Sequence, residues 1–293
     1  MKFNENLTSI HSYLCADGYV IKNPKTQKQK YYYIGFRNTN LVLLKDFQKK
    51  FFNYFKIKPR LNIGERCIVQ KKELYEKLTS KFGSFYSKEW VMPLLNDRLS
   101  KKWLRTFFDC EGWVFCKTHQ NRHIGLDSVN EKGLNQIIKS LNKLGIKTIK
   151  KVNKKRGIFR IFIYGKGNLI KFSKEIGFLH PDKKEKLDVL IKDFVEYKWS
   201  FPSKEKECEL FVKDLLNKKV RIKKPYYIRI VSKEEVNLNK LNQLLYKFYK
   251  INGKVNKRIN GIGTIYYELN INRREDIQKL INKKLIKNIL KEN

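Results

Sequence analysis

Asp17 and Glu111 end two similar segments of the sequence, IHSYLCADG over residues 10–18 and LRTFFDCEG over residues 104–112. Each segment is an apolar run that is compatible with a helix, followed by a small residue, an acid and a glycine. A repeat of this kind can place the two carboxylates side by side. Carboxylate oxygens are ligands that Mg²⁺ prefers, so the pair predicts metal-dependent chemistry on a polyanion.

Small residues four positions apart predict how the two acids meet. Ser12 and Ala16 would share one face of the first helix, and Thr106 and Cys110 one face of the second. Small side chains at this spacing let two helix backbones approach closely. Packing of the two faces would bring together the residues that follow them, and these are the two acids.

The ends of two helices are an unfavourable place for adjacent acids, because helix C-termini carry partial negative charge and neighbouring carboxylates repel. We therefore expect divalent cations between Asp17 and Glu111, stabilising the attacking and leaving oxygens of a phosphoryl displacement. Gly18 and Gly112 are expected to end the helices in the left-handed conformation. The alternative is a pair of ordinary helix-terminal acids, and the matched surroundings of the two acids argue against it.

Charge is the most unusual property of the composition. The 293 residues include 65 Lys and Arg against 28 Asp and Glu, which gives a formal net charge of +37. An excess of this size predicts a nucleic-acid partner. A lysine-rich proteome is the alternative source of the charge, but a thermophile would raise Glu together with Lys. With 41% hydrophobic residues, the chain can form packed domains and is not a disordered polycation.

The cysteines and the lack of long apolar runs indicate the cellular setting. Five cysteines without a CxxC motif argue against a disulfide framework and against a zinc ribbon. No segment approaches the ~18 apolar residues of a membrane span, and the N-terminus does not resemble a signal peptide. We expect a soluble, cytoplasmic protein, or an organellar one in a eukaryote, that is not secreted and binds no membrane.

An order of helix, two strands, helix, two strands and helix recurs three times along the sequence. The predicted domains are residues 1–95, 96–200 and 201–293. Ser100 is the predicted N-cap of the second motif helix. The third copy begins with KEKECELFVKDLLNKK, which has no acid–glycine pair. We therefore expect a degenerate repeat that binds nucleic acid without chemistry, with a coincidental α+β domain as the alternative.

The two segments, followed by YV and WV respectively, resemble the paired motifs of the LAGLIDADG homing endonucleases. The resemblance covers residues 9–190 and includes IGLDSVNEKGL and IGFLHPDKKEKL. It implies an α+β fold of two pseudo-symmetric αββαββα halves, with the motif helices at the interface and antiparallel sheets forming a saddle over the DNA major groove. It also implies a monomer that cuts both strands of a long, specific site with Mg²⁺ (or Mn²⁺), leaving short 3′ overhangs.

The resemblance also implies roles for individual positions. Asp17 and Glu111 correspond to the metal-binding catalytic acids, and the backbone carbonyls of Ala16 and Cys110 to further metal ligands. Basic residues at strand ends would position water and offset charge, with generic surface charge as the alternative. These lysines and a companion pair of polar residues are Lys71, Lys72, Lys166, Asn38 and Ser128.

Three positions of the motif segments depart from the family pattern. Cys15 replaces the first Asp of the motif, which is not the metal ligand. His11 and Arg105 stand where a small residue is usual. For His11, a packing role is favoured over that of a catalytic base.

Contacts to DNA are expected from the strands of the saddle and their loops. Alternation along a strand would turn one face toward the helices and the other toward the groove. Arg and Gln can read base edges, and the lysines would hold phosphates. The candidates not yet named are Lys22, Lys25, Lys28, Lys30, Arg37, Lys117, Gln120, Arg122, Lys150, Lys154, Arg156 and Arg160.

Two alternatives to cleavage remain open at this stage. The same scaffold could be a non-catalytic RNA maturase that binds intron RNA, or a DNA-binding regulator. A generic basic RNA-binding protein is disfavoured, because no strand shows the aromatic pattern of an RNA-recognition sheet.

Overall fold

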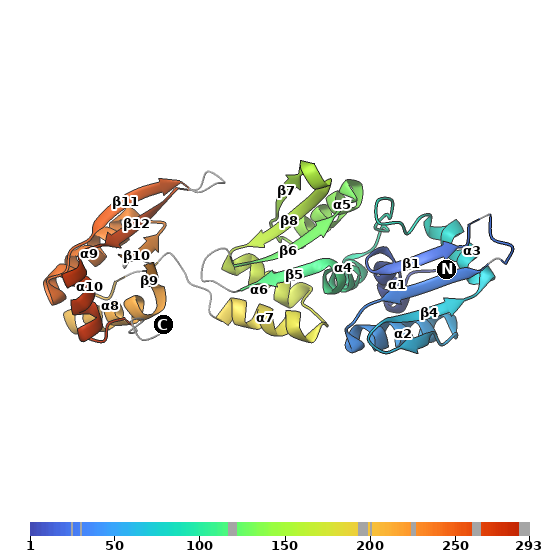
Figure 1. Cartoon of the computed structure of the whole chain (residues 1–293), viewed down its shortest axis with the longest axis horizontal. Helices are drawn as coiled ribbons and strands as arrows, with labels where there is room; N and C mark the ends of the chain where they lie inside the picture. The colour runs from blue at the N-terminus through green and yellow to red at the C-terminus, as the bar shows by residue number, and fades with distance from the viewer. Residues whose placement is uncertain are drawn as a thin grey trace. The chain divides into compact units, whose positions relative to one another are not determined.

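The computed structural model describes residues 1–24, 26–29, 31–116, 122–192, 199, 201–223, 227–259 and 265–286. The chain divides into two compact units, Met1–Phe194 and Val195–Asn293, each with its own hydrophobic core. In Figure 1 the first unit runs from blue to yellow and the second from orange to red. No helix in the described ranges has the length and apolar character needed to cross a bilayer.

The first half of the first unit has the predicted order of elements. Asn4 caps the first helix by accepting a hydrogen bond from the backbone N–H of Leu7 at 3.0 Å. The four strands form an antiparallel sheet in the order β1-β2-β4-β3. The elements are α1 (Glu5–Cys15), β1 (Gly18–Lys22), β2 (Tyr32–Arg37), α2 (Leu41–Phe55), β3 (Arg60–Asn62), β4 (Arg66–Gln70) and α3 (Lys72–Phe82).

The second half repeats this order, with one helix added at its end. Its motif helix begins a turn earlier than predicted, because Asn96 rather than Ser100 accepts the capping hydrogen bond, from the N–H of Leu99. The sheet order is β5-β6-β8-β7. The elements are α4 (Asp97–Glu111), β5 (Gly112–Phe115), β6 (His123–Ser128), α5 (Glu131–Lys143), β7 (Ile149–Asn153), the 3₁₀ turn Lys154–Arg156, β8 (Ile158–Tyr164), α6 (Lys166–Glu175) and α7 (Pro181–Lys192).

The second unit is a third copy of the same connectivity. Its strands pair in the order β9-β10-β12-β11, so in all three described sheets the second strands of the two hairpins lie side by side. The α+β fold class with two αββαββα halves and a related C-terminal unit is thus confirmed. The elements are α8 (Glu205–Lys219), β9 (Arg221–Lys223), β10 (Tyr227–Ser232), α9 (Glu235–Tyr249), β11 (Lys254–Ile259), β12 (Ile265–Ile271) and α10 (Arg274–Asn282).

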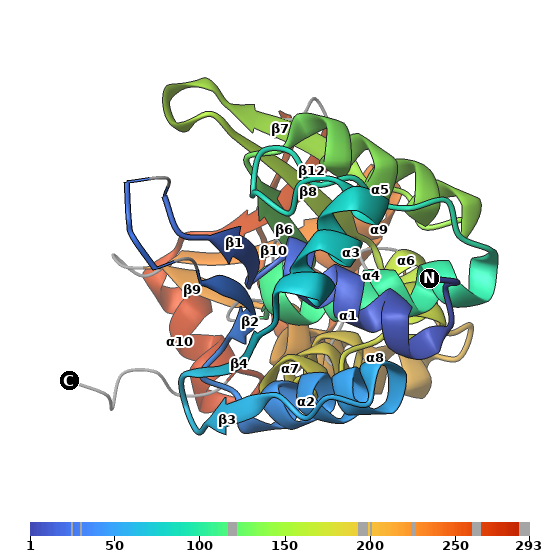
Figure 2. The ribbon, with the colours of Figure 1, turned by 90° about the vertical axis from the view of Figure 1, so that its right-hand side faces the viewer.

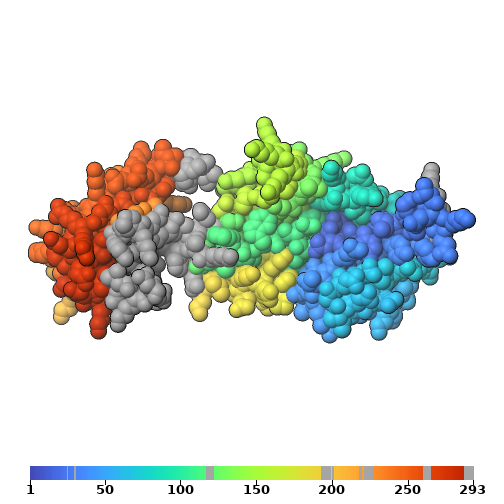
Figure 3. Space-filling view, viewed as in Figure 1, coloured from blue at the N-terminus to red at the C-terminus, as the bar shows by residue number. Residues whose placement is uncertain are grey.

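The two halves of the first unit share one core because α1 and α4 pack against each other. Both views of the ribbon place these helices together (Figures 1 and 2), and the space-filling view shows the blue and green halves in contact (Figure 3). Every residue of α1 from Leu7 to Cys15 is buried. The Ser12 hydroxyl donates a hydrogen bond of 2.7 Å to the carbonyl oxygen of Trp103. A side chain as short as serine reaches the partner backbone only when the helices approach closely, as the small-residue pattern predicts.

Gly18 and Gly112 are required by crowding, and the prediction that they are left-handed is wrong. Gly112 is extended, with φ −80° and ψ 158°, and both glycines begin strands. A Cβ on Gly18 would lie 2.4 Å from the Cα of Leu14, and one on Gly112 would lie 2.6 Å from the carbonyl oxygen of Phe108. The chain therefore turns so sharply from helix into strand that no side chain fits at either turn.

Gly18→Ala should lower the free energy of unfolding by ~1–3 kcal/mol, because the new methyl group meets backbone atoms that cannot move aside. Urea denaturation measures this change. Gly167→Ala is the matched control, since it lies in α6 with open space around it, and should be neutral or slightly stabilising. Equal stabilities of the Gly18 and Gly167 variants would contradict the crowding.

Candidate active site and nucleic-acid interface

The packing of α1 on α4 brings the two motif acids together at one end of the helix pair. Ala16 caps α1 through its N–H to the Ser12 carbonyl, and Asp17 follows in the turn to β1. Glu111 is the last residue of α4. Both side chains are half-buried, and each carboxylate lies within the electric field of the other.

Burial controls the protonation of both acids. Burial, together with the charge of Asp17, raises the pKa of Glu111 to about 7. Burial also raises the pKa of Asp17, although the hydrogen bond from Asn38 and the charge of Lys183 act in the opposite direction. A cation bound between the acids would favour both ionised forms, so this site is electrostatically prepared for one.

The companion polar residues lie beside the acids. The Asn38 amide donates to a carboxylate oxygen of Asp17 at 3.0 Å. Ser128 lines a pocket of about 320 Å³ together with Glu111 and Asp127. One oxygen of Asp127 is buried without a hydrogen-bond partner, while its other oxygen accepts from Arg160 at 2.9 Å.

These donors fit a divalent cation that takes part of its coordination from water. Two half-buried carboxylates and the carbonyls at the helix ends are oxygen ligands of the kind that Mg²⁺ binds, and Mg²⁺ usually retains several waters. Within the described ranges, no cluster of three or more His, Cys, Asp or Glu side chains forms a complete protein cage. Oxygen ligands of this kind suit a hard divalent cation.

Lys183 is a site residue that the sequence reasoning missed. Its ammonium group donates to the carbonyl oxygens of Phe108, Asp109 and Cys110, at 3.3, 2.5 and 3.0 Å, and so caps the C-terminus of α4. Its positive charge lowers the pKa of both Asp17 and Glu111. The IGFLHPDKKEKL segment contains it, but nothing in the spacing shows that α7 returns to the acids.

Asp109 fixes the helix that carries Lys183. One oxygen of this buried carboxylate accepts the backbone N–H groups of Leu179 and His180, both at 2.9 Å, just before α7 begins. Burial nevertheless raises the pKa of Asp109 to about 6. The motif helix therefore holds the start of α7, and α7 in turn returns a lysine to the end of the motif helix.

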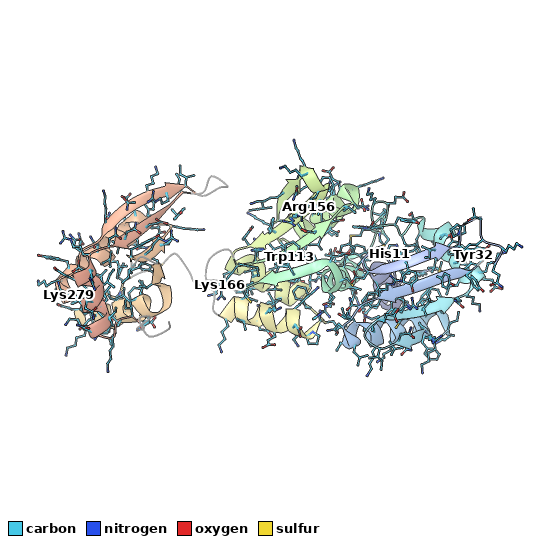
Figure 4. All side chains as sticks on the ribbon, in the orientation of Figure 1. His11, Tyr32, Trp113, Arg156, Lys166 and Lys279 are labelled. Atoms are coloured by element: carbon cyan, nitrogen blue, oxygen red, sulfur yellow. The ribbon has the colours of Figure 1, made fainter. Side chains whose placement is uncertain are left out.

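The lysines predicted at the site lie at the other end of the sheets, which corrects that prediction. In the first sheet Asp17 lies beside Arg37, whereas Lys71 and Lys72 follow Gln70 at the opposite end of β4. Lys166 follows the Tyr164 end of β8, while Glu111 adjoins the Leu126 end of β6. Figure 4 shows Lys166 well separated from His11 of α1. At ~3.3 Å per residue, four or more residues of strand separate each lysine from the acids.

His11 is a packing residue. It is 3% exposed, accepts a hydrogen bond from the Trp103 indole at 3.1 Å, and lies among Phe82 and Phe85. Burial lowers its pKa to about 3, so it stays neutral. These surroundings support the packing role for His11 that the sequence favoured over a catalytic one.

The outer face of the first sheet, which points away from its helices, forms a groove lined by basic, aromatic and aliphatic side chains. A cavity of about 810 Å³ lies over this face. Of the predicted DNA contacts, Arg37 lines it, with its guanidinium over the Tyr19 ring at 5.5 Å. The sequence reasoning identified the strands but missed the other lining residues, which include Tyr33, Arg60, Asn62, Arg66 and Gln70.

The predicted contacts of the second half divide between different surfaces. Arg160 lies on the outer face of β8, and Lys154 and Arg156 lie in the exposed turn before it. Figure 4 labels Arg156 in this turn. Lys150 instead turns toward α5, where its ammonium donates to Glu131 at 2.6 Å and Asn135 at 3.0 Å. The alternation of residues along β7 does not predict this, because alternation alone does not determine which face of a strand meets the helices.

Arg122 corrects the predicted set of DNA contacts. It is 7% exposed, and its guanidinium donates to the carbonyls of Val189 and Leu190 at the end of α7. Lys22 and Lys28 are exposed in and after β1. The remaining candidates, Lys25, Lys30, Lys117 and Gln120, lie outside the described residues.

Lys183→Met should raise the pKa of Glu111 above about 7 in metal-free protein, because removal of the ammonium charge disfavours the ionised carboxylate. Carbon-13 NMR titration of the glutamate side chains measures this pKa. Lys184→Met is the control, since this neighbouring lysine is exposed and should leave the titration unchanged. Identical Glu111 titrations in all three proteins would exclude Lys183 from the electrostatics of the acid pair.

Comparison with known proteins identifies part of this arrangement. Residues 99–177 match the LAGLIDADG-like domain family. No curated protein matches the chain in sequence. Similar solved structures include the homing endonuclease I-DmoI with DNA and Ca (18% identity, 62% of this chain, 98% of that chain, TM-score 0.46). They also include the homing endonuclease I-WcaI bound to its DNA recognition sequence (16% identity, 64% of this chain, 88% of that chain, TM-score 0.45). A third is the N-terminal LAGLIDADG domain of DUF199/WhiA (15% identity, 64% of this chain, 86% of that chain, TM-score 0.42).

The matched residues begin inside α4, contain Glu111 and end just after α6. They therefore cover one αββαββα half, including the second of the two motif segments. The resemblance noted from the motifs is confirmed over this half, where residues 99–177 match the LAGLIDADG-like domain family.

Proposed function

We propose that this chain is a site-specific DNA endonuclease that hydrolyses phosphodiesters on both strands of a long target site. The observation that carries the proposal is the α1–α4 contact, which places two half-buried acids of raised pKa at one point. The net charge of +37 and the arginine-lined groove over the first sheet suit a duplex.

The metal-binding residues in this proposal are Asp17 and Glu111, with the backbone carbonyls of Ala16 and Cys110. The Cys110 carbonyl already accepts a hydrogen bond from Lys183, but a carbonyl oxygen has a second lone pair. A bound Mg²⁺ or Mn²⁺ would supply the positive charge that stabilises the attacking and leaving oxygens of hydrolysis. Without a cation, the acids would repel the phosphate of the substrate.

Two further side chains position this site. Asn38 holds the Asp17 carboxylate in one orientation through the hydrogen bond at 3.0 Å. Lys183 keeps a positive charge beside both acids while its hydrogen bonds to α4 fix its position. Preorganised charge of this kind requires little rearrangement during reaction, which is how electrostatic catalysis gains most of its effect.

Asp17→Asn or Glu111→Gln should abolish cleavage, by about three orders of magnitude or more, because each removes one charged metal ligand. DNA binding should survive. Selection of cleaved products from a random duplex library with Mg²⁺ supplies the substrate, and gel assays of the variants measure cleavage.

Glu73→Gln is the matched control, because this exposed acid lies at the start of α3, at the opposite end of β4 from Asp17. Normal cutting by both motif-acid variants would place the chemistry elsewhere. An empty selection beside tight binding of intron RNA would instead support the non-catalytic maturase.

The second unit is proposed to bind nucleic acid without chemistry. Its helix α8 occupies the place of a motif helix in chain order, yet Glu207, Leu210 and Asp214 along it are exposed. This exposed face differs from α1, which is buried from Leu7 to Cys15. The outer face of its sheet carries Arg229 and Arg258, which both pair with Glu268, at 2.8 and 3.3 Å.

Deletion of residues 204–293 should weaken duplex binding and reduce the slope of affinity against salt, while cleavage persists at saturating protein. Each phosphate contact that is lost lowers the slope by about 0.9. Fluorescence anisotropy over a salt series measures both quantities. Unchanged affinity across the series would remove the second unit from DNA binding.

A further inference from the structure

Five aromatic rings gather on the outer face of the second sheet, on the side opposite its helices. The strand register places them together, since Phe115 pairs with His123, His123 with Tyr164, and the Trp113 and Phe162 positions both pair with Gly125. Figure 4 shows Trp113 on this sheet. The five side chains are partly exposed, and we call them the aromatic face: Trp113 and Phe115 of β5, His123 of β6, and Phe162 and Tyr164 of β8.

The rings of the aromatic face contact one another in sequence across three strands. Phe115 stacks on His123 at 5.3 Å and 18°, and Phe162 stacks on Tyr164 at 5.7 Å and 25°. His123 joins the two pairs, at 5.1 Å from each of the rings of Phe162 and Tyr164. The result is a continuous aromatic surface rather than isolated side chains.

A glycine in the central strand makes room for this surface. A Cβ on Gly125 would lie 2.2 Å from the Trp113 ring, so the indole lies directly over the backbone of β6. The first half has the same device, with Tyr19 over Gly35. There, however, the surrounding outer face mixes aliphatic residues with polar ones, among them Arg37, Arg66 and Gln70. The two sheets therefore share a geometry and differ in chemistry.

Positive charge borders the aromatic face. The Lys151 ammonium lies 5.6 Å from the centre of the Phe162 ring, and Arg160, which is paired with Asp127, lies on the same face of β8. Lys154 and Arg156 are exposed in the turn between β7 and β8. Aromatic rings with cations at their edge complement a nucleobase attached to a phosphate backbone, and they complement an apolar protein surface less well.

We propose that the aromatic face binds unpaired nucleobases of a single-stranded nucleic acid segment. Bases in a duplex expose only their edges in the grooves, whereas aromatic rings bind the flat faces of bases that have been unstacked. This goes beyond duplex cleavage and does not depend on Asp17 or Glu111. From the sequence we expected no aromatic strand of the RNA-recognition type, yet β5 and β8 each place two rings on this face.

The test measures binding of the full-length chain to labelled oligonucleotides of about 12 nucleotides, a length within the usual range of site sizes. Single-stranded RNA, single-stranded DNA and the matching DNA duplex are compared by fluorescence anisotropy. Phe115→Leu and Phe162→Leu should each weaken single-strand affinity by about fivefold or more, the usual effect of losing one base stack. Duplex affinity should fall by a smaller factor, since phosphate contacts dominate it.

Two controls separate stacking from structure. Phe115→Tyr keeps the ring and should keep the affinity for single strands. Tyr86→Leu removes an aromatic side chain that is 67% exposed outside this sheet, and should have no effect. The Asp17→Asn variant should bind single strands as the wild type does, because the aromatic face lacks this acid. Single-strand binding therefore tests the present proposal even if the endonuclease proposal fails.

A higher affinity for RNA than for DNA would show that the protein also contacts the 2′-hydroxyl. Equal affinities would show that base stacking alone determines binding. Either result supports the proposal if the leucine variants lose affinity. A wild-type chain that binds no single strand, or leucine variants that lose duplex and single-strand affinity equally, would overturn it. The first of these outcomes does not depend on the folding of any variant.

Discussion

The close contact between α1 and α4 is the constraint on which the rest of the first unit depends. A serine hydroxyl on one helix reaches the backbone of the other, so the helices must stay near enough to share a single core. That core fixes the sheets on either side, and the ends of the helices fix the two acids. A bulky residue at Ser12 would therefore disturb the fold and the site at once, because one interface positions both.

The cost of this arrangement is electrostatic. Two carboxylates at helix C-termini are partly removed from water, and burial raises the pKa of Glu111 to about 7. The chain offsets part of this cost with Lys183, whose position depends on Asp109 holding the start of α7. The offset is incomplete, because burial remains the dominant influence on both acids. Incomplete compensation is what a site for a further cation requires.

The threefold repetition separates scaffold from chemistry. All three described sheets have the same strand connectivity, although α8 of the third copy exposes charged residues where α1 is buried. Connectivity is maintained by the alternating core residues of strands and helices, which many sequences can supply. The outer faces are not constrained by the core, and they have diverged into an arginine-lined groove over the first sheet and an aromatic face on the second.

The sequence by itself determined the order of elements, the small-residue contact between the motif helices and the pairing of Asp17 with Glu111, because these depend on local periodicity and on a visible repeat. It misplaced Lys71, Lys72 and Lys166, since strand register decides which end of a sheet lies near the acids. It attributed a left-handed conformation to two glycines that are required by crowding. Only the tertiary structure revealed Lys183 at the acids and five rings on one face. Both arise from segments far apart in the sequence that meet through packing, and no pattern within a single segment records that meeting.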